Sequence, residues 1–65
     1  MSTSERHKKL QEALLRLIEA RELVGEVAVD VKPADEAFLY DAAYDSLALI
    51  RCSQGRLRYA LVGAL

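Results

Sequence analysis

The chain contains few of the residues that hold very small proteins together. Its 65 residues include one cysteine, one histidine, one proline and no tryptophan. A single cysteine excludes an internal disulfide, and together with one histidine it is too little for a four-ligand zinc site. A chain this short buries only about 60% of the surface that its unfolded form exposes. We therefore expect a single domain, residues 1–65, that has no cofactor and gains stability as a homodimer.

Long apolar stretches are also missing. The longest uncharged stretch has seven residues and starts at Tyr59, whereas a membrane span needs about 20 apolar residues. The segment from Met1 to Lys9 has no apolar core of the kind found in a signal peptide. We expect a cytoplasmic protein that makes no membrane contact, and the lone cysteine agrees with a reducing compartment.

Charge is nearly balanced overall but unevenly placed along the chain. The formal net charge is −1. Residues 1–25 carry five basic and four acidic groups, residues 26–45 carry six acids and one lysine, and residues 46–65 carry three arginines and no acid. This distribution predicts that the acidic middle pairs with the basic C-terminal part, within one chain or between two.

The N-terminal part predicts a helix over residues 4–24. Ser2 and Glu5 fit a capping box, and Gly25 fits a helix stop. Between them, apolar residues recur at helical spacing and form one stripe. The members of that stripe are Leu10, Ala13, Leu14, Leu17, Ile18 and Val24.

The middle of the chain predicts a strand followed by a short helix. Valine occupies every second position of residues 26–31, which indicates a half-buried strand. Pro33 ends that strand because it has no amide hydrogen to donate. The same proline and the acids that follow it also favour a helix start, and an apolar face extends to about Tyr44.

The C-terminal part predicts a β-hairpin. Two apolar runs, residues 47–52 and 57–65, flank Ser53-Gln54-Gly55, which resembles a tight turn. In the alternative, the second helix continues through Ile50, because apolar residues from Leu39 onward also share a helical face. We prefer the hairpin. The expected fold is α+β, in the order α-β-α-β-β, with both helices packed on a three-stranded sheet.

No group of residues predicts catalysis or metal binding. Asp41 and Asp45 stand four apart, but no further oxygen ligands occur at a recognisable spacing. His7 has cationic neighbours and no orienting partner for general base catalysis. Cys52 is expected to share a buried face with Ile50 as a small core residue. We expect that the protein is not an enzyme and holds no metal.

The C-terminal arm supplies the expected contact surface. Tyrosine and arginine often anchor protein interfaces, and the uncharged arm would pair across a two-fold axis. The expected partner or dimer contacts are Arg56, Arg58, Tyr59, Leu61 and Val62.

The function expected from these observations is that of a small cytosolic protein-interaction or regulatory module. Such a protein would bind another protein as an adaptor, inhibitor or accessory factor. The alternative is a nucleic-acid-associated regulator that contacts phosphates through Arg56, Arg58 and the N-terminal basic cluster, residues 6–9. The interspersed acids make this alternative the weaker one.

Overall fold

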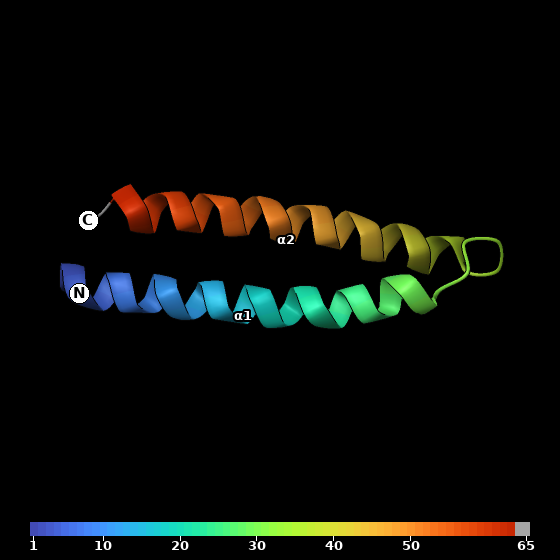
Figure 1. Ribbon diagram of the computed structural model, residues 1–65, viewed down its shortest axis with the longest axis horizontal. Coiled ribbons are helices and arrows are strands. Elements are labelled where there is room, and N and C mark those ends of the chain that lie inside the picture. Colours follow the sequence, from blue (N-terminus) through green and yellow to red (C-terminus); the bar gives the residue numbers. More distant parts are fainter. Residues whose placement is uncertain (64–65) are drawn as a thin grey trace.

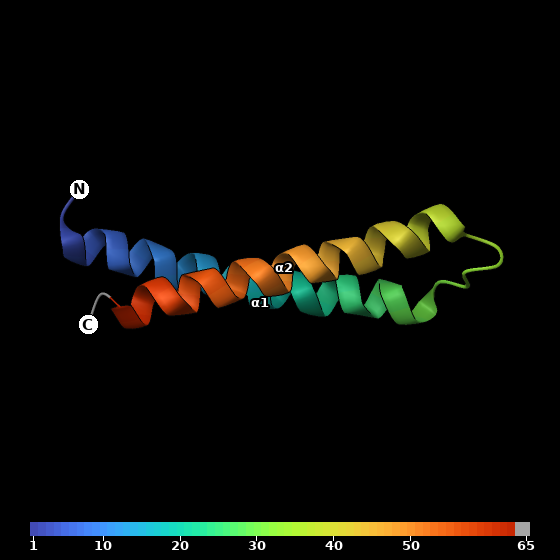
Figure 2. The same cartoon turned by 90° about the horizontal axis from the view of Figure 1, so that it is seen from above.

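The protein is a helical hairpin. A computed structural model describes residues 1–63, in which α1 spans Thr3–Asp30 and α2 spans Ala37–Gly63. The two helices lie side by side and antiparallel, joined by a short loop at one end of the rod (Figure 1). Viewed from above, they cross obliquely near their middles (Figure 2). The rod measures 49 × 15 × 15 Å.

The predicted α+β fold is wrong. No strand occurs in residues 1–63, so the order α-β-α-β-β, the three-stranded sheet and the C-terminal β-hairpin are all replaced by two helices. The last two residues of the predicted strand 57–65 lie outside the described residues.

The start of α1 was predicted correctly, but its end was not. The Ser2 hydroxyl accepts a hydrogen bond from the Glu5 amide at 3.1 Å, as an N-cap should. Gly25 has no positive φ and does not stop the helix, which continues to Asp30. A glycine inside a helix costs about 1 kcal/mol. Burial of Ala28 and Val31 against α2 outweighs this cost.

Val27 and Val29 belong to α1 and not to a strand, and Val31 caps the end of that helix. A strand would place Val27, Val29 and Val31 on one face. In the structure Val31 is 8% exposed, Val27 is 43% exposed and Val29 is 83% exposed, so the three side chains do not share one face. Alternation of apolar residues over so short a segment therefore did not identify the secondary structure.

Pro33 lies where the helical backbone is interrupted, a few residues before the second helix begins. Val31 ends α1 with an extended backbone, φ −76° and ψ 134°. Lys32 precedes Pro33, and a residue in that position is disfavoured in the helical region. The Lys32 carbonyl accepts hydrogen bonds from the amides of Asp35 at 3.1 Å and Glu36 at 2.9 Å. This turn delays α2 to Ala37.

The predicted turn at residues 53–55 is helical because an apolar repeat runs through it. Gly55 has no positive φ, and α2 continues past it. The helical alternative, which stopped at Ile50, was nearer to the structure. Buried or half-buried residues recur along α2 at alternating spacings of three and four, the repeat of coiled-coil packing. They are Tyr40, Ala43, Leu47, Ile50, Gln54, Leu57 and Leu61.

A matching row on α1 completes the seam between the helices. Its buried and half-buried members are Leu14, Leu17, Val24, Ala28 and Val31. The most buried of them, Ala28, is 3% exposed, and Ala43 on α2 is 6% exposed. Small side chains such as these allow two helix backbones to approach closely.

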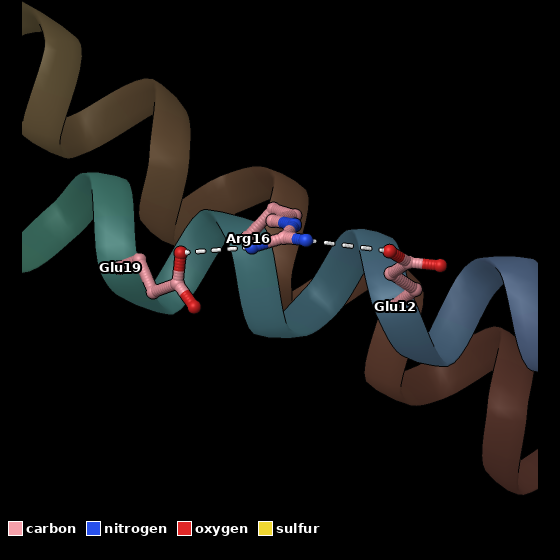
Figure 3. A network of polar contacts seen from close by, with 3 residues as sticks. All are labelled: Glu12, Arg16 and Glu19. Carbon is pink, nitrogen blue, oxygen red and sulfur yellow. Dashed lines mark hydrogen bonds and ion pairs between the residues drawn. The ribbon is translucent and has the colours of Figure 1, made fainter.

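The ion pairs of the hairpin lie on its solvent side. Arg16 reaches Glu12 at 3.5 Å and Glu19 at 3.3 Å, one turn away in each direction (Figure 3). All three side chains are at least 61% exposed. Exposed pairs of this kind contribute about 0.2–1 kcal/mol, so packing rather than charge holds the helices together. Neither helix in the described part of the chain is apolar enough to cross a membrane.

Candidate functional site

Two helices alone leave much of this chain's apolar surface uncovered. Its accessible surface is 5183 Å², whereas a compact monomer of 7.2 kDa exposes about 4,100 Å². The excess is about 1,000 Å², and among residues 1–63 only Ala28, Val31, Ala43 and Gln54 are buried. Large apolar side chains that are more than half exposed occur on both helices, namely Leu15, Leu23, Val29, Phe38, Leu49, Tyr59 and Val62.

One side of the hairpin carries a mainly apolar surface. A groove of about 200 Å³ lies between the helices there. It is lined by Val24 and Val27 of α1 and by Leu39, Ala42 and Ser46 of α2. Residues three and four apart lie on the same side of a helix, which extends this surface along both helices. We term it the apolar face, and it consists of Ala13, Ala20, Leu23, Val27, Leu39, Ala42, Ser46, Leu49, Ser53 and Ala60.

Four charged residues lie within the apolar face or at its ends. Arg16 and Arg56 fall inside its two helical rows, one on each helix. Lys9 and Asp30 continue the α1 row at either end. The Arg16 guanidinium forms ion pairs with Glu12 and Glu19. Arginine can lay its aliphatic stem along an apolar surface and keep its charge in water, so neither arginine prevents another chain from covering the face.

The opposite side of the hairpin is polar. Its groove, of about 340 Å³, is lined by charged groups of both signs on the two helices, Arg21, Glu22 and Arg58. Ile18, Gly25 and Gln54 also border this groove. A mixed-charge surface is well solvated, so the two sides differ in the kind of neighbour that they favour.

Gln54 is the most buried side chain in the described part of the chain. It is 1% exposed, and its Nε2 has no hydrogen-bond partner among residues 1–63. It occupies a seam position between Ile50 and Leu57, where the repeat otherwise selects apolar residues. Sequence reasoning assigned Gln54 to a turn, although the spacing from Leu47 to Leu61 contained the signal for a seam position. An unsatisfied buried donor costs about 1–3 kcal/mol.

Replacing this glutamine with leucine should stabilise the hairpin. Gln54→Leu removes the unpaired amide and keeps a side chain of similar size, so the free energy of unfolding should rise by about 1–3 kcal/mol. Urea unfolding followed by circular dichroism measures the change. Gln11→Leu, at an exposed position of α1, is the matched control. Equal effects from both substitutions would show that burial of Gln54 carries no cost.

The five predicted contact residues do not share one surface. Arg56 and Tyr59 line a groove of about 530 Å³ on the side of α2 that also carries Cys52. Arg58 borders the polar groove instead, because residues two apart on a helix point about 200° apart. Leu61 is half-buried in the seam, and Val62 is 70% exposed. Arg56 and Arg58 therefore lie on different sides of α2.

The remaining chemical candidates are also scattered. Asp41 and Asp45 are exposed on successive turns of α2, and His7 is half-buried near the start of α1. Within residues 1–63, no three histidine, cysteine or acidic side chains are placed to hold a metal ion. Cys52 is a free, exposed thiol, so the prediction that it lies in the core beside Ile50 is wrong.

Comparison with protein-family models, curated proteins and solved structures finds no match to this chain.

Proposed function

We propose that this chain is a protein-interaction module that acts through its surface and carries out no chemistry. It is a helical hairpin that associates with a second copy of itself by burying the apolar face. The observation that carries this proposal is the excess of about 1,000 Å² of exposed surface over a compact monomer of the same mass. Large apolar side chains such as Leu23 and Leu49 are more than half exposed in this surface, and exposed apolar patches generally mark interaction sites.

The apolar face has a suitable size for a stable interface. A rod of 49 × 15 Å presents about 700 Å² on one side, and a standard interface buries about 800 Å² per partner. The face is mainly apolar, since leucine, valine and alanine make up most of it, and Arg16 and Arg56 are the charged residues within its rows. Two hairpins joined in this way form a four-helix bundle, in which each helix has neighbours on two sides.

We also propose that the protein is located in the cytosol. Cys52 is a free and exposed thiol. Thiols of this kind stay reduced in the cytosol, whereas oxidising compartments favour disulfides. A four-helix bundle of this type would serve as an adaptor, inhibitor or accessory factor through the surfaces that remain outside the dimer contact.

The mass in solution tests the proposal. Sedimentation equilibrium at micromolar concentration should give twice the 7.2 kDa of the chain. Thermal unfolding should shift to higher temperature as protein concentration rises, because association stabilises only the folded form. A mass of one chain at every concentration, with an unfolding midpoint that does not move, would contradict self-association.

A further inference from the structure

We propose that the two copies meet with their loops at opposite ends of the dimer. This inference rests on the proposed self-association and specifies its geometry. The apolar faces stack with the 49 Å rods aligned, so that the loop half of each hairpin covers the open half of the other. In the competing arrangement both loops lie at the same end. Two independent properties of the chain separate these arrangements.

The first property is the charge distribution along the rod. Residues 26–45, which form the loop and the adjoining turns of both helices, carry six acids and one lysine. The rest of the chain carries eight basic and four acidic groups. The loop half is thus negative and the open half positive, so each hairpin has opposite charge at its two ends.

Only loops at opposite ends bring unlike charges together. The acidic loop half of one copy then lies over the basic open half of the other, at both ends of the dimer. The α1 row shows the same pattern in detail, since Lys9 continues the apolar face at the open end and Asp30 continues it at the loop end. With loops at the same end, two segments of net charge −5 would be adjacent. Like charges that lie next to each other across an interface oppose the association of the two copies.

The second property is the size of the side chains on the apolar face. Its loop half carries the large apolar residues Leu23, Val27 and Leu39. Its open half carries the small residues Ala13, Ser53 and Ala60, with Arg16 and Arg56 in the same rows. With loops at opposite ends, the large apolar side chains of one copy lie over the small residues and the aliphatic stems of the two arginines of the other copy.

The competing arrangement would be unfavourable at both ends. It places the large apolar residues of the two copies against one another near the loops, which holds the helices apart. At the open ends it brings Arg16 and Arg56 of one copy next to the same arginines of the other, and like charges across an interface oppose association. Side-chain size and charge therefore favour the same orientation.

Distance measurements between spin labels test this orientation. A nitroxide is attached at Asp35→Cys in the loop, in a Cys52→Ser background that removes the exposed native thiol. Double electron–electron resonance on the intact chain should then give a distance between the two copies near the 49 Å length of the rod. A second label at Ser4→Cys, at the open end, should give a similarly long distance.

Mixed samples supply the complementary measurement. Dimers formed from one chain labelled at position 35 and one labelled at position 4 should show a short distance, comparable with the 15 Å width of the rod. A short distance between two loop labels, together with a dimeric mass, would overturn the orientation and leave the proposed self-association intact. Absence of any dipolar coupling between chains, together with a monomeric mass, would overturn both. Circular dichroism of each labelled variant confirms that the helices are retained.

Discussion

The substitution Ala43→Asp is expected to unfold the hairpin. Ala43 is 6% exposed in the seam, in the half of α2 next to the loop. Aspartate there would place an uncompensated charge between two helices, at a cost of several kcal/mol. A domain of 65 residues has a total stability of only about 3–10 kcal/mol. The one substitution should therefore remove most or all of the folded population.

The matched control lies one and a half turns away on the same helix. Ala48 is exposed, so Ala48→Asp makes the same chemical change without burying the charge. It should cost only about 0.5 kcal/mol through the lower helix propensity of aspartate. Far-ultraviolet circular dichroism and urea unfolding distinguish the two variants. A helical signal in Ala43→Asp equal to that of Ala48→Asp would show that the seam near the loop is not a packed core.

The N-terminal helix could be predicted because its signals are local. The hydroxyl of Ser2 and the amide of Glu5 are three residues apart, and their hydrogen bond needs no information from the rest of the chain. The stripe that includes Leu14 and Leu17 likewise needs only helical spacing. The position of Pro33 also marked a true break. These features depend on neighbouring residues, which a sequence displays directly.

The second helix could not be predicted in the same way because its signals compete. Gly55, following Ser53 and Gln54, favours a turn locally, and the apolar runs on both sides suit short strands as well as buried helix. The deciding feature is the repeat that continues across this segment to Leu57 and Leu61. That repeat gains its stabilising effect only when α1 lies beside it, so tertiary packing overrides the local preference.

An exposed apolar surface was predicted from the sequence, but at a different position from the candidate interaction surface of the structure. An uncovered apolar surface was expected from the small size of the chain, on the C-terminal arm alone. In the structure it spans both helices, from Ala13 on α1 to Leu39 and Leu49 on α2. Its two rows meet because the loop reverses the chain at residues 31–36. Their proximity could not be inferred while residues 47–65 were assigned to strands.

The substitution Leu49→Asp is expected to dissociate the dimer. Leu49 is 70% exposed in the single hairpin and lies near the middle of the apolar face. Both copies carry the change, so two charges enter one interface and each must lose its hydration. A penalty of 1.4 kcal/mol raises the dissociation constant tenfold, and each unpaired buried charge costs several kcal/mol. The dissociation constant should therefore rise by at least about 100-fold.

Leu15→Asp is the matched control for this prediction. Leu15 is 61% exposed on α1, away from the apolar face, so its replacement makes the same chemical change outside the contact. Sedimentation equilibrium should give a dimer for Leu15→Asp and a single chain, folded or unfolded, for Leu49→Asp. Leu23→Asp, on the α1 side of the apolar face, should reproduce the loss of the dimer. Wild-type dissociation constants for both Leu23→Asp and Leu49→Asp would place the contact between copies elsewhere on the rod.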